Sequence, residues 1–336
     1  MDIQAISGCL MGMALGDALG AETEFLNVAG ILQRFPPSGP QQPKGNPARV
    51  TDDTQMALAV GDALLAAPRP YSSDTLSTEL IRTFTAWYDD PENNRAPGNT
   101  CLTACEQLLD GKTWVEASQI SSKGRGANMR VMPVGLLDVD AATRAGIAQL
   151  QAAIMHGHPT GLAASDLTAF VIADLGSGGK ADGLAERVRD YAESQRTIYH
   201  ADWLGKLWER AFMLPTAQAY IEHGWSECLA VLDRLDSALV KMDRTNDPCL
   251  ATGAGWIAEE AFATALLCFL IFPDDPVGVI QRAAVTSGDS DSIACIAGSF
   301  AGAYHGIGAW PPDWVERIEY HDHLLKIAEG LSGQEM

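Results

Sequence analysis

Two short acidic stretches contain the residues whose types and spacing could do chemistry. VTDDTQMA at 50–57 places Asp52 and Asp53 between two threonines, at the start of an apolar run with helical spacing. SGDSDSIA at 287–294 alternates two aspartates with serines, again directly before an apolar helical run. Carboxylates and hydroxyls there cap the free N–H groups of a helix start and suit its dipole. Capping explains one carboxylate in each stretch and leaves the other without a role.

A metal site is the alternative to capping for these stretches. Four carboxylates brought together by a fold repel one another unless cations neutralise them. Hard divalent cations prefer such shells of oxygen ligands. For one stretch alone capping is the simpler interpretation, but the two together favour a metal. An EF-hand is excluded because Ile293 and Ala294 follow Asp291, and no glutamate stands at the twelfth position of such a loop.

Glycines recur every fourth residue in two segments next to the acidic stretches. Each interior helical glycine costs up to about 1 kcal/mol relative to alanine, so a row of them is tolerated where another backbone approaches closely. The spacing therefore predicts two tightly packed helices. A membrane-helix interface is excluded because Asp17 interrupts the first segment. The glycines are Gly8, Gly12, Gly16 and Gly20 in the first segment and Gly298, Gly302 and Gly306 in the second.

Helical periodicity dominates the rest of the chain, and alternating strand patterns are nearly absent. Breaks rich in proline and glycine separate the helical segments, for example at 36–47, 89–99 and 176–183. No fixed-period repeat and no linker between two compositions stands out. We therefore expect an all-α fold and a single domain over 1–336. Segment 24–46, which contains four prolines, is expected to be a surface connection that cannot continue a helix.

Composition narrows the class of protein. The 336 residues are 47% hydrophobic and 20% charged, as in a globular protein with a substantial core. The formal net charge of −20 argues against binding to nucleic acid or to an anionic membrane. Seven scattered cysteines and an N-terminus without a basic segment favour a reducing cytoplasm over a disulfide framework and a signal peptide.

Six segments occur in the order typical of the ADP-ribosylglycohydrolase family, which the chain resembles. The resemblance covers roughly 1–160 and 250–310 and is thin between about 180 and 250. Any one segment would be weak evidence, but the ordered set is specific. The segments are GMALGDALGAETEF, RVTDDTQMALA, SKGRGANMRVMPVGLL, MHGHPTG, GAGWIAEEAFATAL and SGDSDSIACIAGSFAGAYHG.

The resemblance implies an orthogonal helical bundle with a binuclear Mg²⁺ or Mn²⁺ centre at the base of an ADP-ribose cleft. Many relatives have a GGDTDT run where this chain has Ser287, Ser290 and Ser292, and serine keeps a hydroxyl that can bind a metal. The second carboxylate of each stretch then has a role as a metal ligand. Carried over by motif, the ligands are Thr51, Asp52, Asp53, Asp289, Asp291 and Ser292.

Glu24 and Asp53 are the candidates for acid–base work. Glu24 matches a family glutamate that approaches the metal centre; alternatively it is a solvated carboxylate at a helix end, and Glu22 takes that role. The implied reaction is attack of water on C1″ of the distal ribose through an oxocarbenium-like transition state. The residues alone do not rank Glu24 against Asp53.

A glycine-rich loop at 124–129 resembles the part of the family cleft that faces phosphate and ribose. Glycine lets a backbone approach closely and point its N–H groups at phosphate oxygens. His156 either contacts the ligand or interacts with the carbonyls of the helix before it. The expected substrate-binding residues are Asp17, Gly124, Arg125, Gly126, Ala127, Asn128, Met129 and His156.

The function implied is hydrolysis of an ADP-ribosyl bond on a protein, with the N-glycosidic link to arginine as the first expectation. The expected partners are an ADP-ribosylated protein and ADP-ribose, and we expect a monomer. The alternatives are an O-linkage on serine, free poly- or O-acetyl-ADP-ribose, and a non-catalytic ADP-ribose-binding or structural relative. Retention of all four aspartates favours an enzyme over the non-catalytic alternative.

Overall fold

The computed structural model describes residues 1–333, and these residues form helices without any β-strand. The prediction of an all-α fold is therefore confirmed. In chain order the α-helices are α1 (Ile3–Gly20), α2 (Val28–Arg34), α3 (Asp52–Ala66), α4 (Ser73–Asp89), α5 (Asn99–Leu109), α6 (Trp114–Ala117), α7 (Met132–Gly135), α8 (Ala141–Ala153), α9 (Pro159–Gly176), α10 (Leu184–Gln195), α11 (Ala201–Leu204), α12 (Ala217–Lys241), α13 (Cys249–Thr252), α14 (Ala258–Ile271), α15 (Pro276–Ala284), α16 (Ser290–His305), α17 (Pro312–Arg317) and α18 (His321–Ser332). Three 3₁₀ helices are η1 (Arg125–Ala127), η2 (Leu207–Arg210) and η3 (Ile307–Ala309).

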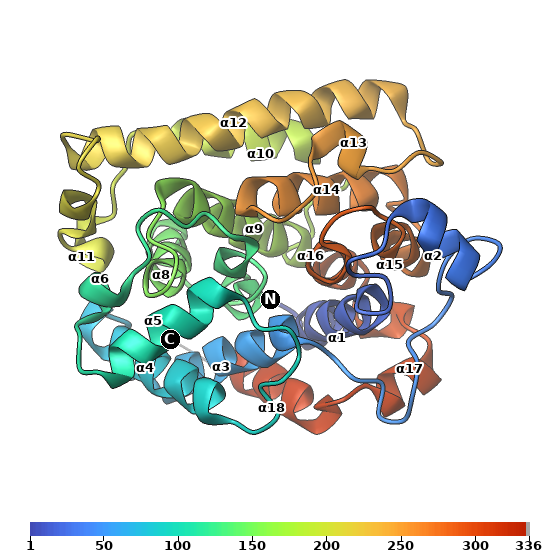
Figure 1. Cartoon of the computed structure of the whole chain (residues 1–336), viewed down its shortest axis with the longest axis horizontal. Helices are drawn as coiled ribbons and strands as arrows, with labels where there is room; N and C mark the ends of the chain where they lie inside the picture. Colours follow the sequence, from blue (N-terminus) through green and yellow to red (C-terminus); the bar gives the residue numbers. More distant parts are fainter. Residues whose placement is uncertain (334–336) are drawn as a thin grey trace.

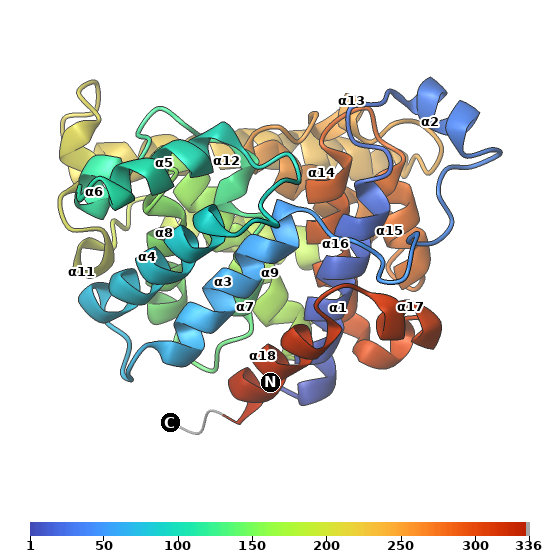
Figure 2. The same cartoon turned by 60° about the horizontal axis from the view of Figure 1, so that its bottom comes forward.

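Helices α1 and α16 lie side by side in the middle of the fold and run antiparallel (Figures 1 and 2). Their glycines face one another. A Cβ built on Gly12 would lie 2.2 Å from the carbonyl oxygen of Gly298, and one on Gly8 would lie 2.4 Å from that of Gly302. Side chains at these positions would hold the backbones apart. The predicted close packing of the two glycine-lined helices is therefore confirmed.

The other helices surround this central pair. Figure 1 shows α12 spanning one edge of the molecule, with α9 and α14 beneath it, while α3 and α4 lie on the opposite side. Helix α9 packs against α8, α12 and α14, and α18 packs against α1 and α3. The buried apolar side chains form one continuous core across these helices. A single core of this extent brings the two ends of the chain into one unit.

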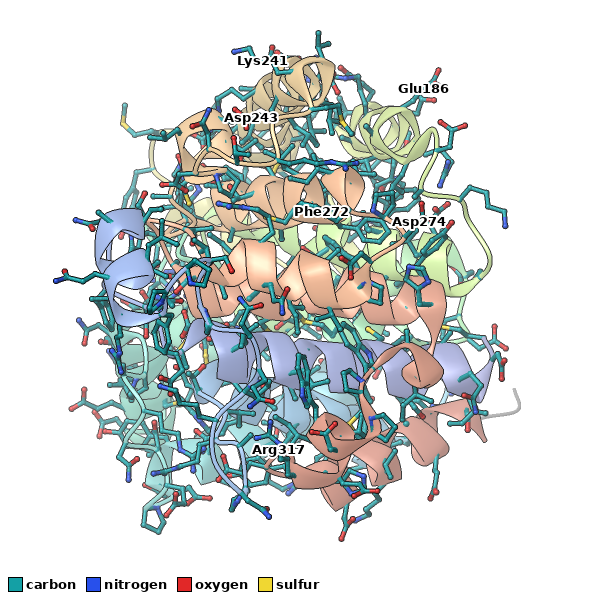
Figure 3. The ribbon with its side chains drawn as sticks, turned by 90° about the vertical axis from the view of Figure 1, so that its right-hand side faces the viewer. Glu186, Lys241, Asp243, Phe272, Asp274 and Arg317 are labelled. Atoms are coloured by element: carbon teal, nitrogen blue, oxygen red, sulfur yellow. The ribbon has the colours of Figure 1, made fainter. Side chains whose placement is uncertain are left out.

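Helix α1 has the length and mean hydropathy, 1.3, of a membrane span, but 83% of that window is buried inside the protein. Its apolar character is accounted for by the core around it. In Figure 3, the charged side chains of Lys241 at the end of α12 and of Arg317 at the end of α17 lie at opposite edges of the molecule.

Segment 24–46 differs from the sequence prediction, because α2 occupies Val28–Arg34 within it. Asn27 caps this helix by accepting a hydrogen bond from the N–H of Gly30 at 2.8 Å. The prolines follow the helix, and they did not prevent it from forming before them. Beyond them, the chain is tied to α17, where Arg317 Nη1 donates to the carbonyl of Gly45 at 2.8 Å.

We predict that Gly12→Ala lowers the free energy of unfolding by about 3 kcal/mol, because its methyl group would overlap the carbonyl of Gly298 and the helices would have to separate. Chemical denaturation of both proteins measures the difference. Gly308→Ala is the matched control, since a Cβ there meets nothing within 4 Å. A Gly12→Ala protein as stable as the control would contradict the packing argument.

Candidate metal centre

The start of α3 is capped without using Asp52 or Asp53. Thr51 Oγ1 accepts a hydrogen bond from the N–H of Asp53 at 3.3 Å. The carboxylate of Asp17, on α1, accepts from the N–H of Thr51 at 3.0 Å and from that of Thr54 at 3.1 Å. These bonds satisfy the N–H groups of Thr51, Asp53 and Thr54 at the helix start. The carboxylates of Asp52 and Asp53 are therefore available for another purpose.

Asp17 has a positioning role rather than the substrate contact expected from the sequence. Its side chain is fully buried, and its Oδ2 also accepts from the hydroxyl of Thr54 at 2.5 Å. Both carboxylate oxygens thus bind the first turn of α3, which fixes that helix relative to α1. No surface of Asp17 remains for a ligand.

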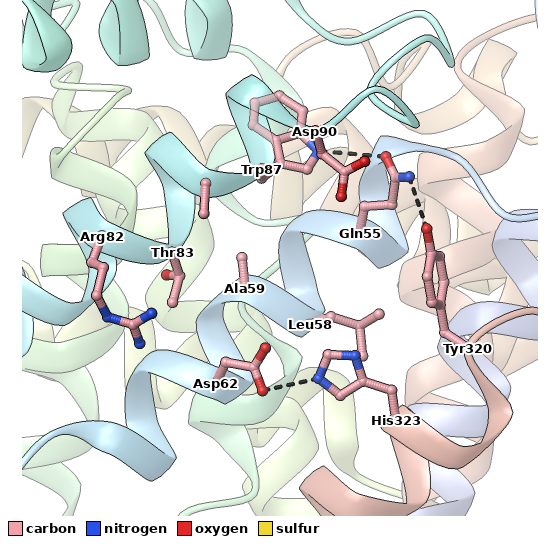
Figure 4. A pocket seen from close by; sticks show the side chains of 11 residues that line it. Gln55, Leu58, Ala59, Asp62, Arg82, Thr83, Trp87, Asp90, Tyr320 and His323 are labelled. Atoms are coloured by element: carbon pink, nitrogen blue, oxygen red, sulfur yellow. Dashed lines mark hydrogen bonds and ion pairs between the residues drawn. The ribbon is translucent and has the colours of Figure 1, made fainter.

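Further along α3, side chains fix its outer face to α4 and α18. In Figure 4, Trp87 Nε1 donates to Gln55 Oε1 at 3.4 Å, and Gln55 Nε2 donates to the hydroxyl of Tyr320 at 3.2 Å. His323 Nε2 lies 2.9 Å from Asp62 Oδ1 in the same cavity. Asp62 and Asp90 line this cavity of about 260 Å³, but neither belongs to a group of described residues that could hold a metal, so we regard the cavity as part of the support for α3.

The start of α16 is held against the end of α1 by hydroxyl groups. Ser290 Oγ donates to the carbonyl of Gly20 at 2.9 Å, and Thr23 Oγ1 donates to Ser290 Oγ at 3.0 Å. Ser292 Oγ donates to Asp53 Oδ1 at 2.7 Å. This last bond joins the two acidic stretches, which are 239 residues apart in sequence.

The fold gathers carboxylates whose oxygens have no hydrogen-bond partner among the described residues. These buried oxygens are Glu24 Oε1, Asp52 Oδ2 and both oxygens of Asp289. Glu24, Asp289 and Asp291 each offer one oxygen, and the three oxygens lie within 4.8 Å of one another. A buried carboxylate without a partner is costly in free energy. Hard divalent cations bound by all-oxygen ligands would remove that cost, so these residues fit the metal centre that the sequence predicts.

The pKa values reflect this crowding. Burial first, and then the charge of Asp291 and other carboxylates, raise the pKa of Glu24 to about 8 although Arg125 lowers it. Burial also raises the pKa of Asp52 to about 7, against the opposing effect of Arg125. The pKa values of Asp53 and Asp289 are well above the usual range for the same reasons. The centre thus resists ionisation unless a cation is supplied.

Arg125 supplies one positive charge to the centre. Its Nε forms an ion pair with Asp289 and donates to Ser292 Oγ at 3.2 Å, and its Nη2 lies 3.7 Å from Glu24 Oε1. Neither oxygen of Asp289 accepts a hydrogen bond from the described residues, so Arg125 is its cationic partner. In the sequence prediction Arg125 belonged to the phosphate-binding loop, whereas its guanidinium lies among the predicted metal ligands.

The rest of the glycine-rich loop borders a cavity of about 190 Å³ that also reaches Asp52. Gly126 must be glycine there, because a Cβ would lie 2.7 Å from the ring of His156. The predicted Gly124 and Met129 also line the cavity, and Gly124 has ordinary space around it. Ala127 and Asn128 are buried, and Asn128 Nδ2 donates to the carbonyl of Ala258 at 3.0 Å. Their contacts position the loop.

The structure gives no hydrogen bond from the His156 side chain to the described carbonyls of the preceding helix, and its contact with a ligand stays a prediction. The backbone N–H of His156 donates to the carbonyl of Ala152 at 2.8 Å, as expected for a residue at a helix end. Its side chain lines the cavity, and Nδ1 is buried without a hydrogen-bond partner. Burial, followed by the charges of Arg130 and Arg125, holds its pKa well below the usual range. A neutral imidazole is therefore available to a ligand.

A second group of possible metal ligands consists of His158, His223 and Glu227. The backbone N–H of Thr160 donates to His158 Nδ1 at 3.3 Å, because His158 caps α9. Lys123 Nζ donates to Glu227 Oε2 at 2.9 Å. These side chains already stabilise the fold, and we assign no metal to them.

Two aromatic residues beside the centre were missed by the sequence analysis. Phe25 follows Glu24 directly and is 70% exposed, and Trp256 lies just before α14 and is 39% exposed. Their rings stack, with centroids 5.8 Å apart and planes at 17°. The signal available in the sequence was their position inside the segments GMALGDALGAETEF and GAGWIAEEAFATAL, but exposure and stacking cannot be read from such segments.

The raised pKa values predict how stability depends on pH. The pKa of Glu24 is about 8 in the fold against an ordinary 4.5, and that of Asp52 about 7 against 3.8. Between about pH 4 and pH 8 the folded protein therefore holds protons that the unfolded chain has released, and its stability falls as pH rises. Thermal unfolding in chelator should show a lower Tm at pH 8 than at pH 5.

Mg²⁺ or Mn²⁺ should reduce that loss of stability at pH 8, because the ionised carboxylates would bind the cation. Comparing the pH series measured in chelator with the series measured with the cation separates the effect of the acidic centre from the general effect of the negative net charge. An identical pH dependence with and without the cation would show that the carboxylates do not bind it.

We predict opposite effects of Asp291→Asn on stability and on metal affinity. The charge of Asp291 raises the pKa of Glu24, Asp53 and Asp289, so its removal should stabilise the metal-free protein. The same change should weaken Mg²⁺ or Mn²⁺ binding, measured by calorimetry, by about tenfold or more. Asp202→Asn, an exposed change of equal charge, is the control. Unaltered metal affinity in Asp291→Asn would remove the residue from the centre.

Comparisons with known proteins agree with this site. The family model described as ADP-ribosylglycohydrolase matches residues 2–336. The chain is 25% identical to "ADP-ribosylarginine hydrolase Tri1" of Pseudomonas putida, over 96% of this chain and 76% of that protein. It is 24% identical to "ADP-ribosyl-[dinitrogen reductase] glycohydrolase" of Rhodospirillum rubrum, over 93% and 89%. It is 26% identical to human "ADP-ribosylhydrolase ARH3", over 96% and 92%.

A solved structure titled "ADP-ribosylglycohydrolase-related protein complex" has the same fold, with a TM-score of 0.71, 21% identity and 99% of each chain covered. The match of the family model over almost the whole chain agrees with the helical fold and with the acidic centre between α1, α3 and α16. The chain therefore belongs to the ADP-ribosylglycohydrolase family.

Proposed function

We propose that this protein removes ADP-ribose from modified arginine side chains of proteins by hydrolysing the N-glycosidic bond. The observation that carries the proposal is the group of buried carboxylate oxygens without hydrogen-bond partners, beside a cavity bordered by a glycine-rich loop. Relatives with similar identity include an ADP-ribosylarginine hydrolase and a glycohydrolase for ADP-ribosylated dinitrogen reductase. ADP-ribose and an ADP-ribosylated protein are the proposed ligands.

The proposed cofactors are two Mg²⁺ or Mn²⁺ ions. One ligand set would come from the start of α3 and the other from the start of α16, and Ser292 already contacts Asp53 between them. When bound, such ions orient hydroxyl groups of a sugar and increase the acidity of water. The proposed ligands are Thr51, Asp52, Asp53, Asp289, Asp291 and Ser292.

Glu24 is favoured over Asp53 for proton transfer. Asp53 is completely buried, and its Oδ1 already accepts a hydrogen bond from Ser292. The Glu24 side chain is 8% exposed, Oε1 has no hydrogen-bond partner, and the residue lies in the connection between α1 and α2. A carboxylate in such a connection can follow a proton during a reaction more readily than one inside a helix.

The cavity-lining residues would hold the rest of the ligand. The loop from Gly124 to Gly126 places its backbone against the cavity, and His156 lies behind it. The first residues of α5, from Asn99, border the same space. Helix starts and glycine-rich backbone are suited to the diphosphate of ADP-ribose because their N–H groups point outward.

The test compares matched peptides that carry ADP-ribose on arginine or on serine, each with Mg²⁺ and with chelator. We expect release of ADP-ribose from the arginine-linked peptide with Mg²⁺ and its loss in chelator. Cleavage of the serine-linked peptide alone would move the activity to the other linkage. Absence of cleavage with either peptide, while ADP-ribose still binds, would indicate a non-catalytic relative.

Glu24→Ala serves as the control for the active site. It should bind ADP-ribose with an affinity close to that of the natural protein and lose at least about 100-fold in kcat, because the proton-transfer group is absent. Calorimetry with ADP-ribose and the peptide assay separate these effects. Normal turnover in this variant would exclude Glu24 from the chemistry.

A further inference from the structure

The aromatic pair Phe25 and Trp256 stands at the edge of the acidic centre. Phe25 lies in the connection between α1 and α2, and Trp256 lies just before α14, so the two rings meet from different parts of the fold. Trp256 also borders the cavity that reaches Asp52. The pair therefore combines exposed aromatic surface with direct proximity to the proposed catalytic Glu24.

The conformation of Phe25 has no explanation in the packing of the core. Its φ is +64°, a left-handed conformation that bulky side chains rarely adopt, and its ring remains 70% exposed. Strained backbone of this kind concentrates at sites of function, where the surrounding structure maintains it. In this conformation the Phe25 ring stacks on that of Trp256.

Trp256 already has a guanidinium beside its ring. The Cζ atom of Arg125 lies 5.4 Å from the centroid of the indole. The backbone N–H of Arg125 donates to the backbone carbonyl of Trp256 at 3.4 Å. A planar cation near an aromatic face is attracted by the negative charge of the π system. The carboxylates of Glu24 and Asp289 close by provide a negative environment for such a group.

We propose that Phe25 and Trp256 form the subsite for the modified side chain, and that they bind the guanidinium of an ADP-ribosylated arginine. The inference rests on the proposed function and adds the residues that distinguish the leaving group. An arginine link presents a planar group that stacks on aromatic rings, whereas a serine link has neither a plane nor a charge. The −20 charge of the chain also favours an arginine-bearing partner surface.

The test measures kcat and KM for the arginine-linked and serine-linked peptides with Phe25→Leu and Trp256→Leu. Leucine keeps an apolar side chain and removes the aromatic face. KM for the arginine-linked peptide should rise about tenfold in each variant with a smaller change in kcat, and Trp256→Phe should recover most of the loss. Affinity for free ADP-ribose, which lacks the modified side chain, should stay within about twofold in Phe25→Leu, because Phe25 does not line the cavity proposed for ADP-ribose.

Phe212→Leu is the matched control, because Phe212 is 97% exposed and lies between η2 and α12. Thermal unfolding verifies that each variant is folded. If the natural protein cleaves the arginine-linked peptide and neither leucine variant changes its KM, the subsite is wrong while the proposed function stands. If ADP-ribose affinity falls as much as KM rises, the rings bind ADP-ribose itself and the inference is overturned. Cleavage of the serine-linked peptide alone would overturn the proposed linkage first, and the subsite with it.

Discussion

The close contact between α1 and α16 is the constraint on which the rest of the structure depends. Because glycines face each other along both helices, the two backbones meet without intervening side chains. This contact brings the end of α1 against the start of α16, where Ser290 bonds to the carbonyl of Gly20. Glu24 and Asp289 are thereby placed near each other, although they lie at opposite ends of the chain. A wider separation of these helices would dismantle the acidic centre.

Burying several carboxylates close together destabilises the fold, and contacts around the acidic centre reduce this destabilisation. Asp17 is buried but receives hydrogen bonds from Thr51 and Thr54, so its charge is used to fix α3. Arg125 offsets part of the remaining negative charge. Several carboxylate oxygens still lack hydrogen-bond partners, as expected of a site that is arranged to bind a ligand and that lowers the stability of the fold. The same residues that weaken the empty fold are those best suited to bind cations.

Family membership and substrate choice have different physical origins in this protein. The chain is 24% to 26% identical to relatives whose names specify arginine, dinitrogen reductase or neither, so sequence similarity does not distinguish the linkage. Selection of a linkage must come from groups beside the centre, where the leaving side chain would lie. Phe25 and Trp256 are the groups that we propose for that position, and Arg125 contacts both Trp256 and the carboxylate of Asp289.

The sequence by itself determined the helical class, the tight pairing of the glycine-lined helices and the importance of both acidic stretches, because periodicity and spacing are local properties of the chain. It did not determine the separate roles of Asp17 and Arg125, the helix α2 before the prolines, or the exposed stack of Phe25 and Trp256. Each of these depends on which distant groups a side chain meets. Tertiary structure decided that Thr51 and Asp17 would cap α3 while Asp52 stayed free, because hydrogen-bond partners and burial exist only once the helices have packed.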